Sequence, residues 1–338
     1  MTDYLKRIAA GERLTFDEAC AVMHLLLKGE ASPEQTAGLL MGLRGRGESL
    51  DELTGFTKVM REYAVPVAVN DPDAIDVVGT GGDGSGTFNI STATMFVCAG
   101  AGATVAKHGN RSVSSKCGSA DVLRELGVFV ELPAEQASAC INQAGLGFMF
   151  APLFHPALRF VMPVRRALAA RTFFNILGPL CNPAGVQSGL FGAFAPDVAD
   201  AMGQILERLG GRRVLTVHSE DGLDEFSIAA TTTVRSFGLP AWALVRPEDL
   251  GLPSASLADI RGGDASVNAD IIRAILRGDE GPHRDVVLLN AAFALITAGK
   301  CDDPQEGLEL ARESIDGGGA ARSLQAMVDA SQSLRPSA

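Results

Sequence analysis

The stretch from Asp76 to Asp121 constrains the fold of this chain more than any other. The apolar run at 75–78 enters a loop that carries five glycines, Gly79, Gly81, Gly82, Gly84 and Gly86. An Asn-Ile-Ser-Thr turn at 89–92 then opens a helix-like apolar segment. Free backbone N–H groups at a glycine loop and a helix start favour anions. The stretch therefore predicts a strand, a loop and a helix that together hold a phosphate group.

The alternation of strand-like and helix-like segments continues along the rest of the sequence. Apolar runs predict strands at 74–78, 103–106, 146–150, 188–194, 213–218 and 233–237, with helical segments between them and beyond. Such alternation is typical of an α/β domain with a mostly parallel central sheet. Ligands in such sheets bind beyond the carboxyl ends of the strands. We therefore expect function in the loops that follow residues 78, 106, 150 and 218.

The first 66 residues show a different, wholly helical pattern. Three capping boxes mark helix starts, at Thr15 with Glu18, Ser32 with Gln35 and Ser49 with Glu52. No catalytic constellation is visible in this part, and packing or oligomerisation is its simplest role. The fold class expected is a small all-helical N-terminal domain, 1–66, and a larger α/β domain, 73–338.

The glycine loop allows more than one ligand. Residues 79–84 match GxGxxG after a strand, which is compatible with a dinucleotide site. A dinucleotide site usually has an acidic residue at the end of the second strand, which binds the ribose hydroxyls. The second strand here ends in Lys107, His108, Gly109, Asn110 and Arg111 instead. Cations in place of the acid disfavour NAD and favour an anionic ligand.

Several other side chains are candidates for the same site. Asn89, Ser91 and Thr92 offer caps and hydroxyls at a helix start. Ser114, Ser115 and Ser119 can donate to phosphate oxygens, although Ser119 also fits the N-cap of the next helix. His108 is either a scaffold residue or a group for proton transfer. The segment 171–180 either walls an aromatic substrate or packs in the core.

Two charged features lie farther along the chain. Arg165, in a helix after the third strand, is able to clamp a carboxylate, but a solvated helix face explains it equally well. Asp224 and Glu225 follow the strand at 213–218, in a loop that we expect at the same sheet edge as the glycines. Carboxylate oxygens suit Mg²⁺ that is bound mainly through substrate phosphates.

Composition limits the function classes. The 338 residues carry a net charge of −11, which argues against nucleic acid or a membrane surface as a partner. The six cysteines form no CxxC pair, so no zinc or redox motif is indicated. No apolar run is long enough to span a bilayer, and no secretory signal opens the chain. A cytoplasmic location is expected.

Taken together, the motifs resemble one family over nearly the whole chain. They are GTGGD at 79–83, NIST at 89–92, KHGNR at 107–111, SSKCGSAD at 114–121, HPALRFVMPVRR at 155–166, RTFFNILGPLCNP at 171–183 and DGLDE at 221–225. Their order and spacing are similar to those of anthranilate phosphoribosyltransferases, which belong to tryptophan biosynthesis and are related to nucleoside phosphorylases. The resemblance implies transfer of phosphoribose from phosphoribosyl pyrophosphate (PRPP) to the amino group of anthranilate, with release of pyrophosphate. It also implies a homodimer, with helices from about 154–180 joining the small domain.

The resemblance implies substrate-binding and metal-binding roles for individual residues. It implies PRPP contacts at Gly79, Gly82, Asp83, Thr87, Asn89, Ile90, Ser91, Thr92, Lys107, His108, Gly109, Asn110, Arg111, Ser112, Val113, Ser114, Ser115 and Ser119. It implies anthranilate contacts at Gly79, Asn110 and Arg165, with Pro152, His155 and Gly178 along the access route. Two Mg²⁺ ions per subunit are implied, with Ser91, Asp224 and Glu225 as ligands. No catalytic residue is certain; Asn110 and Arg165 position substrate, and His108 is a possible base.

Departures from the family pattern are small. Cys117 replaces a serine or another small residue, Ala169-Ala170 replaces a segment that often carries glycine, and Leu158 replaces methionine or tyrosine. None removes an expected ligand. Two rival functions stay open: a nucleoside phosphorylase on the same fold, which would need no Mg²⁺, and a relative that has lost catalysis and binds nucleic acid. The Asp224-Glu225 pair opposes the first rival and the acidic net charge opposes the second.

Overall fold

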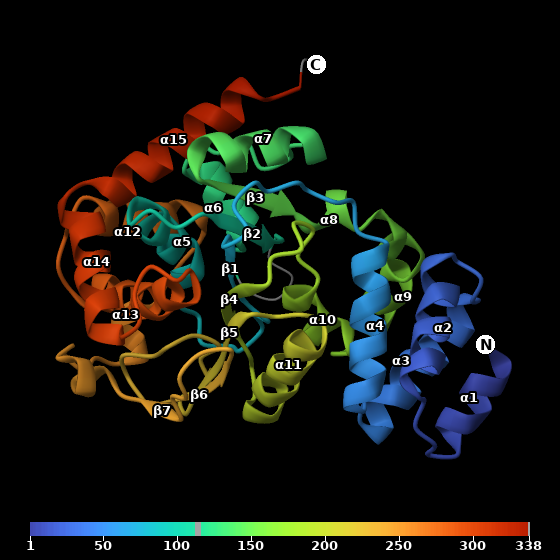
Figure 1. Ribbon diagram of the computed structural model, residues 1–338. Helices are drawn as coiled ribbons and strands as arrows, with labels where there is room; N and C mark the ends of the chain where they lie inside the picture. The colour runs from blue at the N-terminus through green and yellow to red at the C-terminus, as the bar shows by residue number, and fades with distance from the viewer. Residues whose placement is uncertain (112–115, 337–338) are drawn as a thin grey trace.

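The N-terminal part of the protein is a bundle of four helices (Figure 1). The structure, a computed structural model, describes residues 1–111 and 116–336. The helices are α1 (Thr2–Ala9), α2 (Phe16–Leu27), α3 (Pro33–Arg46) and α4 (Leu50–Glu62). All three expected capping boxes form, so each box satisfies backbone groups at the start of its helix. The helical prediction for this part is confirmed.

A seven-stranded sheet forms the centre of the larger part. Its strands are β1 (Ile75–Gly79), β2 (Val105–Gly109), β3 (Leu146–Phe150), β4 (Ser188–Gly192), β5 (Arg213–Ser219), β6 (Thr232–Phe237) and β7 (Leu244–Val245). Their order is β3-β2-β1-β4-β5-β6-β7. The first five in this order run parallel, and β6 and β7 are antiparallel additions at one edge. The carboxyl ends of β1, β2, β3 and β5 therefore open at one edge of the sheet.

Helices cover the sheet on both sides (Figure 1). On one side, α5 (Ile90–Gly100) packs against α13 (Pro282–Thr297), α14 (Pro304–Asp316) and α15 (Gly319–Ser333), with α12 (Ala265–Leu276) beside them. On the other side, α11 (Pro196–Arg208) lies between β5 and α4. The shorter α6 (Ser119–Glu125) and α7 (Ala134–Ala144) flank the β2–β3 edge. Both sheet faces are thus buried, as a parallel sheet requires.

The apolar core is divided into two clusters. One fills the α/β part. The other joins the N-terminal helices to the middle of the chain, where η1 (Pro156–Phe160), α9 (Met162–Leu168) and α10 (Phe174–Leu180) lie. Phe56 of α4 stacks on Phe173 with ring centroids 4.5 Å apart, and Arg61 donates to the carbonyl of Leu180 at 2.7 Å. The middle segment therefore packs with the bundle as well as with the sheet.

The expected fold class is confirmed, with local differences. The helix expected to carry Arg165 after the third strand is split at Val161 into η1 and α9, because Pro163 enters where the helix restarts. The segment 171–180, for which no helix was expected, contains α10, and a short α8 (Ala151–Phe154) follows β3 directly. In the described ranges, no helix is long and apolar enough to cross a membrane.

Candidate active site

The glycine loop after β1 has the conformation that its composition predicts. Gly81, Gly82, Gly84 and Gly86 all have positive φ, between 64° and 78°. Side chains rarely adopt these angles, so the sequence Gly-Gly-Asp-Gly-Ser-Gly is what allows this path. The loop leaves backbone groups near the start of α5, whose first N–H groups have no partner within the helix. The strand, loop and helix expected from the sequence are therefore present.

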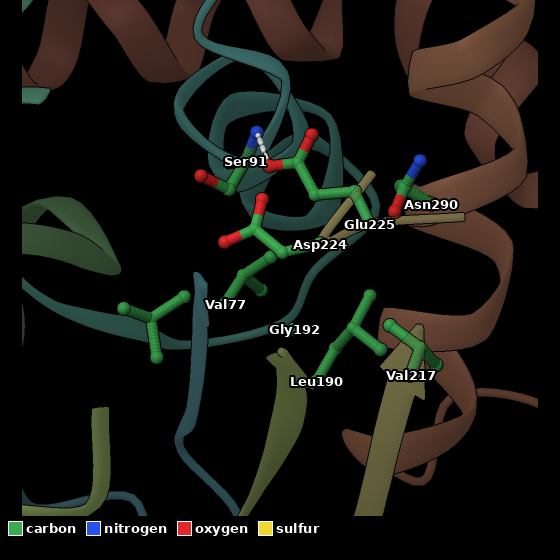
Figure 2. Close-up of a pocket in the computed structure, with 9 residues that line it drawn as sticks. Val77, Ser91, Leu190, Gly192, Val217, Asp224, Glu225 and Asn290 are labelled. Atoms are coloured by element: carbon green, nitrogen blue, oxygen red, sulfur yellow. Dashed lines mark hydrogen bonds between the residues drawn. The ribbon is translucent and has the colours of Figure 1, made fainter. Parts of the chain in front are cut away.

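Asp224 and Glu225 reach this loop from a distant part of the chain. The Asp224 Oδ2 atom accepts a hydrogen bond from the Gly81 N–H at 2.6 Å. The Glu225 Oε1 atom accepts one from the Ser91 N–H, at the start of α5, at 2.9 Å (Figure 2). The predicted meeting of the acidic pair with the glycine loop and the NIST turn is confirmed.

Two glycines make the close approach possible. A Cβ atom at Gly79 would lie 2.4 Å from the Asp224 Oδ2 atom. A Cβ atom at Gly192, the last residue of β4, would lie 1.5 Å from the Asp224 carbonyl oxygen. Real Cβ atoms do not approach other atoms so closely, so both positions must lack a side chain. The sequence showed Gly79 as a loop residue, but the packing role of Gly192 was missed.

Burial and mutual repulsion disfavour the charged forms of Asp224 and Glu225. Burial, followed by repulsion from Asp83, raises the pKa of Asp224 to about 6. Burial, followed by repulsion from Asp224, raises the pKa of Glu225 well above its usual range, although Glu225 keeps some exposed surface. Beneath the pair is a cavity of about 10 Å³ with an apolar lining that includes Val77, Leu190 and Val217 (Figure 2). A cation would relieve this repulsion.

The donor set fits Mg²⁺ that is shared with a substrate. Within residues 1–111 and 116–336, no three His, Cys, Asp or Glu side chains converge to hold a metal. One buried and one partly buried carboxylate beside the glycine loop leave several coordination positions for other oxygens. Mg²⁺ is usually held by one or two carboxylates together with substrate phosphates and water. The residues present therefore fit the expected ion.

The end of β2 contains a buried charged network. Lys107 is 2% exposed, and its ammonium donates to the Val77 carbonyl. Asp76 accepts hydrogen bonds from the His108 N–H at 3.3 Å and from the Asn182 Nδ2 atom at 2.6 Å. Burial raises the pKa of Asp76 to about 6, against the opposing effect of the Lys107 charge. The cation expected at the mouth of the site thus lies behind the loop, facing carboxylates.

His108 and His155 form a buried pair with ring centroids 5.1 Å apart. Burial lowers the pKa of His108 to about 3 and that of His155 to about 4. Among the described residues, neither Nε2 atom has a hydrogen-bond partner. A histidine with so low a pKa is neutral at pH 7 and a weak base. The structure thus favours a positioning role for His108 over proton transfer.

The polar residues after β2 are held by local contacts. The Ser119 hydroxyl donates to the Asn110 carbonyl at 3.1 Å. Arg111 pairs with Glu131 at 2.9 Å and lies over the Phe150 ring. Ser119 is not the N-cap that the sequence allowed, since Gly118 takes that position. The remaining expected contacts in this loop, Ser112, Val113, Ser114 and Ser115, lie outside the described residues.

The NIST turn differs in detail from the expectation. Asn89 precedes α5, but its side chain makes no capping bond. Its Oδ1 atom accepts from Asn268 at 2.9 Å, and its Nδ2 atom donates to the Cys117 carbonyl at 3.3 Å. Thr92 is fully buried and its hydroxyl has no partner in the described part of the chain. Thr87, near the end of the glycine loop, bridges to Arg261.

The expected anthranilate residues lie on the segment after β3. Arg165, on α9, is half-buried with its guanidinium 5.0 Å from the centre of the Phe174 ring. Burial lowers its pKa, and no carboxylate pairs with it among the described residues. Gly178 on α10 is exposed, and a Cβ atom there would meet open space. Pro152, on α8, is exposed, whereas His155 is buried.

Sequence reasoning missed four polar residues of the site. The Arg171 guanidinium donates to the Gly82 carbonyl and lies over the Phe194 ring, so it braces the glycine loop. Three buried amides were also missed. Asn182 bonds to Asp76 and Asn268 bonds to Asn89. Asn290 bonds to the main chain of Phe226. An isolated asparagine within an otherwise apolar helix was the available signal for Asn290.

The protein matches two family models in succession. Residues 2–64 match the helical bundle domain of a glycosyl transferase family, and residues 71–321 match its a/b domain. A relative from Salinibacter ruber, an anthranilate phosphoribosyltransferase, is 52% identical with 99% of both chains covered. One of the same name from Moorella thermoacetica is 49% identical with 96% of each covered.

The chain belongs to the anthranilate phosphoribosyltransferase family. The crystal structure of the Thermus thermophilus member has a TM-score of 0.92 at 44% identity, covering 97% of this chain and 99% of that one. A Saccharomyces cerevisiae member, solved in complex with PRPP and Mg, has a TM-score of 0.87 at 26% identity and 98% coverage of both. Family membership makes the protein a glycosyltransferase of tryptophan biosynthesis and confirms the activity that the sequence motifs predict.

Proposed function

We propose that this protein transfers the phosphoribosyl group at the sheet edge where the glycine loop meets Asp224 and Glu225. PRPP is the donor, anthranilate is the acceptor, and N-(5-phosphoribosyl)anthranilate and pyrophosphate are the products. The observation that carries the proposal is the convergence of the glycine loop with the carboxylates of Asp224 and Glu225. A phosphorylase that uses free phosphate has no need of such a pair. The yeast relative's complex with PRPP and Mg supports this reading.

Different loops bind the phosphate groups of PRPP and the Mg²⁺ ions. The backbone N–H groups of residues 79–92 and the polar residues of 107–119 hold the pyrophosphate and ribose phosphate. Asp224 and Glu225, with Ser91 beside them, would hold the two Mg²⁺ ions expected per subunit. Bound Mg²⁺ supplies positive charge to the leaving pyrophosphate. The Glu225–Ser91 contact keeps the acidic pair aligned with the start of α5.

Anthranilate, the acceptor, binds mainly to residues of the segment that follows β3. Arg165 takes the anthranilate carboxylate, because its charge has no acidic partner in the described structure and its location is half-buried. Gly79 and Asn110 contact the ring, while Pro152, His155 and Gly178 line the access route. The amino group of anthranilate is uncharged at neutral pH, so its lone pair is free to form the C–N bond as the C–O bond to pyrophosphate breaks. One N–H proton is released only after that attack, so the reaction needs positioning more than a base. The low pKa of His108 is consistent with this.

Three broader properties belong to the same proposal. The protein acts as a homodimer in the cytoplasm, without nucleic acid or membrane partners. The boundary between its domains runs between 66 and 73, and helices from 154–180 join the small domain. The contact of Phe56 with Phe173 supports the last assignment.

One assay tests the function. Anthranilate fluoresces, so its consumption is followed directly in the presence of PRPP and Mg²⁺. We expect loss of fluorescence only when both are present, and none after chelation of Mg²⁺. A reaction of pyrimidine nucleosides with phosphate, without loss of anthranilate at saturating PRPP and Mg²⁺, would overturn the proposal.

A further inference from the structure

Asn290 is a buried amide in an otherwise apolar setting. It lies on α13, where residues 286–297 are all buried, and its own exposure is 1%. Asparagine is a poor helix former, and a buried amide costs stability unless it is hydrogen-bonded. Asn290 lines the small cavity beneath Asp224 and Glu225 (Figure 2). Its place in the helix therefore calls for a contact that an apolar residue cannot make.

That contact is a two-point bond to the main chain of Phe226. The Phe226 N–H donates to the Asn290 Oδ1 atom at 3.0 Å, and the Asn290 Nδ2 atom donates to the Phe226 carbonyl at 2.9 Å. The second Nδ2 proton goes to the Val286 carbonyl at 2.8 Å. Among the described residues, these two groups of Phe226 have no other partner. The side chain thus pairs with Phe226 as a neighbouring strand would.

The loop is held at both ends of the acidic pair. On one side, the Asp224 carbonyl packs over the bare Cα of Gly192. On the other side, Phe226 is fixed by Asn290, and its ring stacks on Phe293 of the same helix at 4.1 Å. Ring packing alone leaves the rotation of the peptide groups free, whereas the two amide bonds set it. Glu225 lies between these points, so its direction follows from them.

We propose that Asn290 is a positioning residue, which sets the orientation of the Asp224-Glu225 pair for the Mg²⁺-bound substrate. The inference rests on the proposed function, because it assigns the pair to that substrate. Residues behind metal-binding side chains usually tune affinity by fixing ligand geometry, and their loss typically costs roughly 10–100-fold in metal affinity. Asn290 itself touches neither substrate nor ion in this assignment.

Two variants and one control test the proposal. Asn290→Ala removes all three bonds, whereas Asn290→Asp keeps the volume and the acceptor but loses both donated bonds. Val287→Ala, at another buried position on α13, weakens packing without removing a hydrogen bond. The readout is PRPP binding by calorimetry across a Mg²⁺ titration, without anthranilate, so that no turnover occurs. Melting temperature and steady-state kinetics are measured in parallel.

We expect both Asn290 variants to raise the half-saturating Mg²⁺ concentration at least about tenfold. We also expect kcat to fall while the KM for anthranilate changes less than about twofold, and Val287→Ala to leave the Mg²⁺ midpoint unchanged. If Asn290→Ala does not fold, Asn290→Asp decides the question. A lower melting temperature with an unchanged Mg²⁺ midpoint would overturn the inference. Failure of the wild-type protein to bind PRPP would instead contradict the proposed function.

Discussion

At the scale of single residues, Arg165 is a half-buried cation whose position suits an anionic ligand. Its charge is half-buried against Phe174 and has no carboxylate partner in the described structure. The next residue, Arg166, is exposed on the same helix. Sequence alone left a carboxylate clamp and a solvated helix face equally open for Arg165. Burial and the lack of an acid favour the clamp.

We predict that Arg165→Ala raises the KM for anthranilate by about 10–100-fold, because a charge-assisted bond to a carboxylate contributes roughly 1.5–3 kcal/mol. The KM for PRPP should change little, since PRPP binds at the opposite loop. Arg166→Ala is the matched control and should behave as the wild type does. Steady-state kinetics with each substrate varied in turn provide the measurement. Equal rises in both KM values would rule out the role.

The residues that sequence reasoning missed share a physical cause. Asn182, Asn268 and Asn290 act through bonds to distant segments, such as the bond from Asn290 to Phe226. Nothing local distinguishes Asn182 or Asn268 from a loop or cap residue, whereas Asn290 could be noticed only as an isolated amide in an apolar run. The candidates that were found, such as Asp224 and Ser91, belong to recognisable motifs. Contact partners across 64 to 179 residues become visible only in the folded chain.

At the scale of elements, the end of β4 limits how the acidic loop can lie. Gly192 gives the Asp224 carbonyl the space that a side chain would occupy. The strand was predicted correctly, but its last residue looked like an ordinary glycine. In α3, by contrast, a Cβ atom at Gly45 would meet nothing within 4 Å. The two glycines therefore have opposite tolerance for alanine.

Gly192→Ala should displace the Asp224 loop, because the new Cβ would overlap the carbonyl oxygen. We expect overpacking to cost about 1–3 kcal/mol of unfolding free energy and Mg²⁺-dependent activity to fall more than about tenfold. Gly45→Ala should instead raise the unfolding free energy by about 0.5–1 kcal/mol with full activity. Chemical unfolding and the fluorescence assay check both. An active, stable Gly192→Ala protein would contradict the packing argument.

Elements were predicted well where the local signal was strong. The six predicted strands and the capped N-terminal helices agree with the structure, because hydrophobic periodicity and capping boxes are local, whereas the two-residue strand β7 was not predicted. The segment 171–180 was not resolved into a helix, since Gly178 and Pro179 disfavour that structure and tertiary packing of Phe173 and Phe174 overrides them. The fold class and the convergence of the site followed from the alternation of predicted strands and helices and from the order and spacing of the motifs. The buried position of Lys107, behind the glycine loop, could not be predicted from the sequence.

At the scale of the whole molecule, Asp76 links stability to pH. Its pKa rises from 3.8 to about 6 on folding, because it is buried at the centre of the sheet. Below about pH 4 both states hold the proton. Between about pH 4 and 6 the unfolded chain releases it while the folded chain keeps it, so unfolding becomes easier as pH rises. Above about pH 6 the full contribution, about 3 kcal/mol, is lost.

We therefore predict that Asp76→Asn reduces the fall in unfolding free energy between pH 4 and pH 7 by up to about 3 kcal/mol. Other buried carboxylates, including Asp224, contribute the same slope in both proteins and cancel in the comparison. Urea unfolding at a series of pH values provides the data. Parallel pH profiles for the wild type and the variant would show that Asp76 keeps an ordinary pKa.

The divided core has a consequence for how the chain folds during synthesis. The N-terminal helices leave the ribosome first, yet their apolar faces pack on residues from Val161 to Val214. The α/β core is completed only by α15, at the very end, which packs on α5. Domains generally fold as units once their full set of contacts exists. Part of the apolar surface of the N-terminal helices therefore stays exposed until the residues up to Val214 have been synthesised.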